Sequence, residues 1–306
     1  MLENKSTNMV LVYGPHDFSS NPELFIRTGN PRLGIDDAHK NIQRALFKVF
    51  TDSNSIYRIN KLFGRENEFQ KFIHLNFINY GNTQLVYKAK LSDNNHVAVL
   101  INQPHTSLGV VKNEFENLES LAKLDDRFVV RPKGFFSAEE FGHELYVTDY
   151  VPNALCIAHN NVPDNPHGVF NPNPNYHFEK FPAKLSSIIN SSIIALLIHY
   201  YDRKNDRGIA QTQVSGNDFI FIKNNRRKNT YNTLYDLKLI SARGFVNVSF
   251  EKYYYMLMNE FCIGTNRDYV GVLSGKIKIN HKSVLPMTKE EILLGISMGV
   301  NLRYKR

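Results

Sequence analysis

The 306-residue sequence predicts an α+β fold in which a five-stranded antiparallel sheet precedes a mainly helical part. Three observations support this prediction. Short alternating apolar runs gather between about residues 75 and 150, a single amphipathic helix interrupts them, and helical periodicity dominates after residue 183. Hydrophobic residues make up 42% of the chain, which is enough for a sizeable core and argues against wholesale disorder.

The sheet is predicted within residues 75–153, where strand-like apolar runs are bounded by turn residues. A helix is expected after the third strand, because Phe115, Leu118 and Leu121 recur with helical spacing. The fourth strand is expected to be broken by Pro132, which cannot donate to a sheet ladder. The predicted strands are 76–79, 85–91, 96–102, 128–136 and 144–150, and the predicted helix is 110–124.

Residues 1–74 are predicted to be a partly helical leader with structure of its own. A short strand is expected at 9–13, and Asp36 or Asp37 is placed to cap a helix that runs through Phe50. This segment carries no chemical motif, and core packing is favoured over a helix-turn-helix because the turn signature is absent. Further short helices are predicted at 55–63 and 66–72.

Residues 154–182 are rich in asparagine and proline and predict a long loop between two lobes. The histidines of this loop, His159, His167 and His177, are not spaced like the ligands of a tetrahedral zinc site, so no metal is assigned to them. Residues 183–306 are predicted to form the helical lobe. Its predicted helices are 183–205, 249–261 and 289–298, with a short strand pair at 218–222 and 237–240.

The formal net charge of +8 favours an acidic partner: nucleic acid, nucleotide phosphates or an anionic membrane surface. Basic residues cluster at 223–228 and 303–306, without the aromatic interleaving of a single-strand binding platform. The apolar stretch 185–201 contains too many polar residues for a membrane span and predicts a buried helix. Cys156 and Cys262 lack zinc or disulfide spacing, so a cytoplasmic, reducing environment is expected.

A glycine–asparagine bend lies in residues 80–88, YGNTQLVYK, shortly before a Val-Ala-Val strand. This stretch resembles the phosphate-covering loop of the aminoglycoside- and choline-type small-molecule phosphotransferases, which share the protein-kinase-like fold. The resemblance implies that Gly81, Asn82 and Thr83 approach the phosphates of a nucleotide. It also implies that Val86 packs on the adenine ring.

The strand Val97-Ala98-Val99-Leu100 is similar to the Val-Ala-Ile-Lys strand of kinases. In that family the lysine holds the α- and β-phosphates and pairs with a glutamate of the following helix. Leu100 stands at the place of the lysine, and Glu114, or alternatively Glu116, at the place of the glutamate. Lys88 and Lys90 share a strand face with Val86, which leaves open whether one of them supplies the missing cation or both are solvated.

Residues 144–154 resemble the last strand and hinge of the family, which implies that Asp149, Tyr150 and Val151 lie at the adenine. The family's catalytic aspartate precedes its metal-binding asparagine by five residues. Either Asn217 or Asp218 can stand at the metal ligand. Thr212 or Gln213 then stands at the catalytic aspartate, and neither side chain takes a proton near neutral pH.

The second metal ligand of the family is the aspartate after a further short strand. Ser241 stands there, and serine is a poor Mg²⁺ ligand compared with a carboxylate. Asp236 lies at the other end of this strand, five residues earlier. We hypothesise that Arg243 occupies the position of the metal ion and contacts phosphate directly.

The resemblance spans roughly residues 75–245 and implies a bilobal protein-kinase-like fold with a degenerate active site. Gln213, Asp218 and Glu114 are assigned to the catalytic positions, although the missing charges favour a nucleotide-binding or regulatory pseudokinase. The alternatives are an active atypical ATP-dependent phosphotransferase and a basic nucleic-acid-associated or adaptor protein without a nucleotide site. ATP or another nucleotide is the expected ligand and Mg²⁺ is disfavoured, while a protein partner or a small-molecule substrate stays open.

Overall fold

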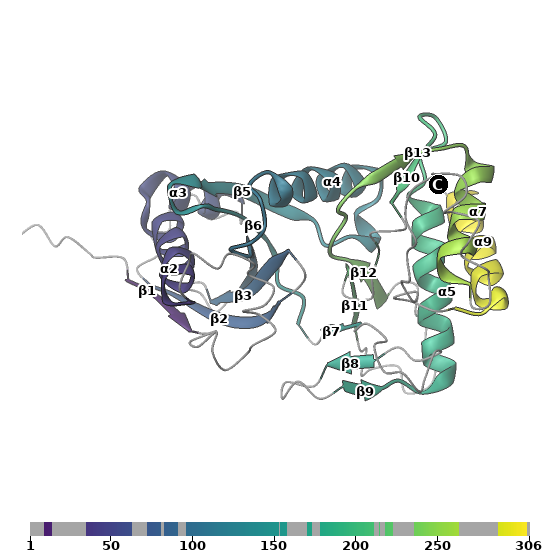
Figure 1. The fold of residues 1–306 in the computed structure, drawn as a ribbon, viewed down its shortest axis with the longest axis horizontal. Coiled ribbons are helices and arrows are strands. Elements are labelled where there is room, and N and C mark those ends of the chain that lie inside the picture. Colours follow the sequence, from purple (N-terminus) through teal and green to yellow (C-terminus); the bar gives the residue numbers. More distant parts are fainter. Residues whose placement is uncertain are drawn as a thin grey trace, which may run out of the picture. The chain divides into compact units, whose positions relative to one another are not determined.

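The computed structural model describes residues 9–13, 35–62, 72–80, 83–90, 96–152, 154–157, 170–172, 178–210, 214, 218–222, 236–262 and 287–304. The chain divides into two compact units (Figure 1). The first unit comprises Met1–Glu119 and Arg131–Tyr150. The second comprises Ser120–Val130 and Val151–Arg306.

The first unit is built on a sheet with the strand order β1-β2-β3-β4-β6-β5. Strands β2 to β6 pair antiparallel throughout, which confirms the predicted five-stranded antiparallel sheet. A sixth strand, β1, comes from the leader and pairs parallel with β2. The strands are β1 Met9–Tyr13, β2 Phe72–Tyr80, β3 Gln84–Lys90, β4 His96–Asn102, β5 Pro132–Ala138 and β6 His143–Asp149.

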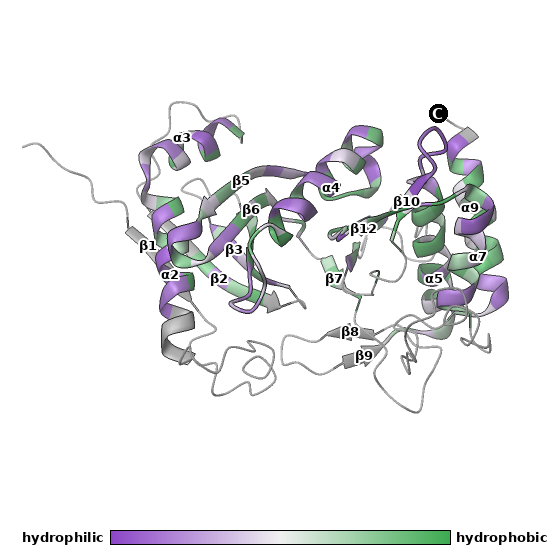
Figure 2. Ribbon diagram, turned by 45° about the horizontal axis from the view of Figure 1, so that its top comes forward, coloured by the Kyte–Doolittle hydropathy of each residue, from purple (hydrophilic) through white to green (hydrophobic). Residues whose placement is uncertain are grey.

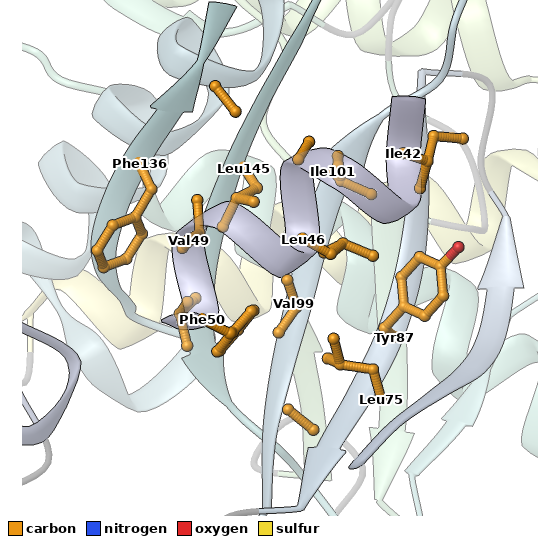
Figure 3. Close-up of a cluster of buried hydrophobic side chains, with 14 of the residues drawn as sticks. Ile42, Leu46, Val49, Phe50, Leu75, Tyr87, Val99, Ile101, Phe136 and Leu145 are labelled. Carbon is orange, nitrogen blue, oxygen red and sulfur yellow. The ribbon is translucent and has the colours of Figure 1, made fainter. Parts of the chain in front are cut away.

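The helix α2, Ile35–Thr51, covers one face of this sheet (Figure 3). Its apolar residues recur every three to four positions, so that Ile42, Leu46, Val49 and Phe50 all point at the strands. Alternate residues of the strands pack against this helix, because successive side chains of a strand point to opposite faces of the sheet. These are Leu75, Leu85, Tyr87, Val97, Val99, Ile101, Leu145 and Val147, all of them buried.

The leader residues that the structure describes therefore belong to the same unit as the sheet. The predicted helix that runs through Phe50 is confirmed, and a second helix, α3, follows at Ser53–Leu62. Most of the helix predicted at 66–72 lies outside the described residues, but its last residue is already in a strand, because β2 begins at Phe72.

The opposite face of the sheet carries α4, Val110–Leu124, at the predicted bounds. Phe115 of α4 packs against Phe135 and Tyr146, whose ring centroids lie 5.9 and 6.1 Å away. The prediction of a strand over 128–136 was wrong at its start. Asp125 caps a short 3₁₀ turn at Asp126–Phe128, and Pro132 is the first residue of β5, where its missing N–H costs no ladder bond.

The second unit combines three long helices with short ladders: α5 Ala183–His199, α7 Phe250–Phe261 and α9 Lys289–Tyr304. The helix predicted at 183–205 ends at His199, because the chain then turns back at Asp202 to pair with Arg207. The ladders are β12-β11-β7 (Leu237–Leu239, Phe219–Ile222, Ala154–Cys156), β10-β13 (Arg207–Ile209, Phe245–Asn247) and β8-β9 (Phe170–Pro172, Phe178–Lys180). The segment predicted as one long loop thus contains three short strands.

Helices α5 and α9 pack unusually closely. Thirteen of the seventeen residues of α5 are buried, and two glycines of α9, Gly295 and Gly299, face its backbone. A methyl group on Gly299 would lie 2.6 Å from the carbonyl oxygen of Ala195. Within the part of the chain that the structure describes, no helix combines the length and apolar character needed to cross a membrane.

Candidate functional site

The residues predicted to hold a nucleotide divide between the two units. Gly81, Asn82, Gln213 and Asn217 lie outside the described residues, as does Thr212. The remaining predicted residues are Thr83, Val86, Leu100, Glu114, Asp149 and Tyr150 in the first unit, and Val151 and Asp218 in the second.

Leu100 lies on the sheet face that carries α4. The register places it beside Val86 on β3 and Tyr146 on β6, so its two lateral neighbours are apolar. The side chain is 7% exposed. A leucine in this position offers van der Waals contact alone and supplies no charge for a phosphate.

Glu114, at the place of the family's helix glutamate, points into the unit. It is buried, and its Oε2 accepts a hydrogen bond of 2.7 Å from Nε2 of Gln84. Glu116, the alternative assignment, is exposed. The hydrogen bond ties α4 to β3. In kinases the lysine makes this connection to the helix glutamate, whereas the amide of Gln84 makes it without a positive charge.

Asn102, at the end of β4, organises the chain around Thr83. Its Nδ2 donates to the carbonyl oxygens of Gly142 and Thr106, both at 3.2 Å, and its Oδ1 accepts from the backbone N–H of Glu144 at 2.8 Å. Thr106 in turn donates from Oγ1 to the carbonyl oxygen of Thr83, at 3.0 Å. Buried hydrogen bonds of this kind are costly to leave unmade, so Asn102 fixes the start of β3.

The carboxylate of Glu144 lies at the beginning of α4. Its Oε2 accepts from the backbone N–H of Gly109 at 2.7 Å, one residue before the helix. Negative charge at a helix N-terminus is stabilising, because the first N–H groups have no partner within the helix. Gly109 has a φ of 90°, a left-handed conformation that a residue with a Cβ adopts only with strain.

His143 is buried within the Asn102 network. Its Nδ1 lies 3.1 Å from Oδ1 of Asn102. Burial lowers the pKa of His143 from 6.5 to about 4, and the hydrogen bond to Asn102 opposes this shift only in part. Between these two values the unfolded chain binds a proton that the folded chain does not, so the free energy of unfolding should fall as pH is lowered through this window.

We therefore expect the full chain to lose about 3 kcal/mol of stability between pH 7 and pH 4 through this group. Denaturant unfolding of the wild type and of His143→Gln across this range would measure it, because glutamine does not titrate. His105→Gln, at a partly buried histidine of the same unit, is the control. A pH slope that disappears in the control rather than in His143→Gln would contradict the assignment.

The hinge residues lie at the end of β6. The ammonium group of Lys88 lies 4.5 Å from the centroid of the Tyr150 ring, a cation–π geometry. Asp149 is largely exposed and pairs with Lys133 at 3.1 Å. Lys88 therefore contacts the predicted hinge rather than Glu114, the partner of Gln84.

In the second unit, Asp218 and Ser241 come together at one end of the β11–β12 ladder. The N–H of Ile240 donates to the carbonyl oxygen of Asp218 at 2.8 Å, so Ser241 follows directly. Asp236 is at the other end of β12, as the sequence register predicted. The pairing of the two short strands thus places the two predicted metal-ligand positions close to one another.

Asp218 forms an ion pair with Arg243. Nη2 of the guanidinium donates to Oδ1 of the carboxylate at 2.5 Å, and the two side chains are 21% and 3% exposed. The charge of the Asp218 carboxylate is therefore matched by a cation of the chain itself. Within the described residues, no group of three histidine, cysteine, aspartate or glutamate side chains is arranged to hold a metal.

Sequence reasoning missed Gln84 and Asn102. The signal for Gln84 was present, because the alternation that puts Lys88 on the face of Val86 also puts Gln84 there. Nothing comparable marked Asn102, whose partners Thr106, Gly142 and Glu144 lie up to 42 positions away. Its role depends on the pairing of β4 with β6, which one sequence does not show.

No known protein-family model matches the chain. Among solved structures, the chain is similar to the apo form of the GRMZM2G135359 pseudokinase, with 16% identity and a TM-score of 0.35 over 76% of this chain and 85% of that one. It is also similar to vaccinia related kinase 3, with 10% identity and a TM-score of 0.34 over 57% of this chain and 49% of that one. The predicted α+β fold class is confirmed: a five-stranded antiparallel sheet with a helix after β4 is followed by a mainly helical unit.

Proposed function

We propose that this chain is a pseudokinase-type regulatory module that binds a nucleotide without a divalent cation. The ion pair between Arg243 and Asp218 is the observation that supports this most directly. Working kinases use carboxylates here to hold Mg²⁺, which neutralises the phosphates. A carboxylate that is already neutralised by an arginine has little left to gain from a metal ion.

The first unit supports the same proposal. Leu100 removes the phosphate-binding cation, and Gln84 replaces its structural contact with Glu114. Val86, Leu100 and Tyr150 are the residues proposed to receive an adenine ring, and they lie beside the polar side chains of Gln84 and Lys88. The narrower placement among aminoglycoside- and choline-type phosphotransferases is part of the proposal and rests on the sequence at 80–88 and 150–152.

Thermal unfolding of the full chain with ATP or ADP, each with and without Mg²⁺, tests the proposal. A ligand at about 100 times its dissociation constant stabilises a protein by about 2.7 kcal/mol, which for a chain of this size is a shift of several degrees. We expect equal shifts with and without Mg²⁺. A shift that requires Mg²⁺ or Mn²⁺ would favour the active phosphotransferase, and no shift with any nucleotide would contradict nucleotide binding.

A variant pair locates the binding surface. Val86→Glu places a negative charge on the proposed adenine face and should abolish the shift. Asn113→Glu makes the same charge change at an exposed position of α4 and should leave the shift unchanged. Equal nucleotide responses in the two variants would place the nucleotide elsewhere.

A further inference from the structure

A tight basic turn links α5 to β10 in the second unit. Asp202 and Arg207 exchange two backbone hydrogen bonds, of 2.7 and 3.0 Å, which close the turn. The carboxylate of Asp202 accepts from the backbone N–H of Lys204 at 2.9 Å and from the side-chain amide of Asn205 at 2.6 Å. Asp206 holds a φ of 49°, and its carbonyl oxygen accepts from the N–H of Val248 at 2.7 Å. Hydrogen bonds of its own backbone and of Asp202 therefore hold the conformation of the turn.

Four cationic side chains lie around this turn: Arg203, Lys204 and Arg207 from the turn itself, and Arg303 from α9. These four residues are called the basic turn. The three arginines lie over aromatic rings, with guanidinium carbons 4.8, 3.8 and 5.9 Å from the centroids of Phe250, Phe245 and Tyr201, respectively. Figure 2 shows the turn beside β10 in the hydrophilic colour.

Asp202 and Asp206 belong to the same turn and offset part of this charge, so the six charged side chains sum to +2. Asp202 is committed to the backbone of the turn, and Oδ1 of Asp206 accepts from the hydroxyl of Tyr201 at 2.9 Å. Burial, followed by Asp206, raises the pKa of Tyr201 to about 12, so this hydroxyl stays protonated and donates. Among the described residues, Arg203, Lys204 and Arg207 form no ion pair with a carboxylate, and all three are exposed.

Stacking on aromatic rings orders the arginines in advance. A guanidinium presents its N–H donors in the plane of the group, so a ring against its face leaves the edge donors available. Paired N–H donors match the two oxygens of a phosphate, and an ordered side chain loses less entropy when it binds. Arg203 and Arg207, each stacked on a ring, and the exposed Lys204 thus form a surface for several phosphates.

We infer that the basic turn is a contact surface for the sugar–phosphate backbone of a nucleic acid. The formal net charge of +8 adds long-range attraction for such a polyanion. Phosphate contacts of this kind position a strand without reading its sequence. The surface belongs to the second unit alone and is independent of the proposed nucleotide binding.

Fluorescence anisotropy of a labelled oligouridine with the full chain, over a range of salt concentrations, tests the inference. The slope of log K against log salt is about −0.7 for each phosphate contact to a single strand. The triple variant Arg203→Gln/Lys204→Gln/Arg207→Gln should flatten this slope by about 2 and weaken binding at low salt tenfold or more. The double variant Arg203→Lys/Arg207→Lys keeps the charge, so it should keep the slope and lose affinity only a few-fold, which guards against a fold defect.

A charge-matched control removes three exposed lysines of the first unit, Lys61→Gln/Lys90→Gln/Lys112→Gln. Its slope and affinity should stay close to those of the wild type. Equal losses in the two triple variants would mean that net charge alone binds the RNA and would overturn the inference. Absence of RNA binding by the wild type, or displacement of the RNA by polyglutamate at equal charge concentration, would overturn it as well; the second result would indicate an acidic protein partner.

Discussion

Replacing Gly299 with alanine should lower the thermal midpoint of the chain by several degrees, although alanine is the better helix former. Propensity alone would favour alanine by about 1 kcal/mol. The added methyl group, however, would lie 2.6 Å from the carbonyl oxygen of Ala195 and 2.7 Å from Cβ of Ile198. Both belong to the mostly buried helix α5, and overpacking of this kind typically costs about 1–3 kcal/mol.

The net loss expected for Gly299→Ala is about 2 kcal/mol, measured by calorimetry or denaturant unfolding. Gly295→Ala should behave alike, since its methyl group would meet the carbonyl oxygen of Ser191 and Cβ of Ile194. Ser297→Ala, at an exposed position of the same helix, isolates propensity and should be neutral or slightly stabilising. If Gly299→Ala were as stable as Ser297→Ala, the close approach of α5 and α9 would be refuted.

Replacing Arg243 with methionine should destabilise the chain by about 3 kcal/mol, because it leaves the carboxylate of Asp218 buried without its cation. The double variant Arg243→Met/Asp218→Asn removes both charges and should recover much of the loss. Arg131→Met, at an exposed arginine of the first unit, should change little. Similar losses for the single and the double variant would show that the pair contributes packing rather than charge compensation.

The thermal midpoint of Arg243→Met should also respond to divalent cations. With Arg243 gone, millimolar Mg²⁺ or Mn²⁺ should raise the thermal midpoint of Arg243→Met, because a bare carboxylate is a ligand for hard cations. The wild type and the double variant should not respond. A cation response in the wild type equal to that in Arg243→Met would contradict the idea that the arginine takes the place of a metal.

The fold was largely predictable because its signals are local. Strand β4 and helix α4 have their predicted bounds, since alternation and helical periodicity are clear over seven and fifteen residues. The helix predicted beyond His199 failed for a reason that lies elsewhere in the chain. The segment after it pairs with β13, about forty residues later, and such pairing outweighs local propensity.

The candidate site was less predictable, because its chemistry depends on which distant residues meet. The sequence placed Asp218, Ser241 and Arg243 in order, but the ion pair between the first and the last follows from the pairing of β11 with β12. The replacement of a lysine by Gln84 likewise required the register of β3 against β4. Tertiary packing sets such strand registers, and a single sequence does not show which residues of two strands lie opposite one another.

Helix α2, which covers the sheet, limits where the chain can be truncated. Ile42, Leu46, Val49 and Phe50 hide an apolar surface made by five strands. A fragment that began at residue 75, where the resemblance to kinases begins, would leave that surface exposed to water or to other chains. A shortened protein that keeps this surface covered therefore has to begin upstream of Ile35, because α2 belongs to the same compact unit as the sheet.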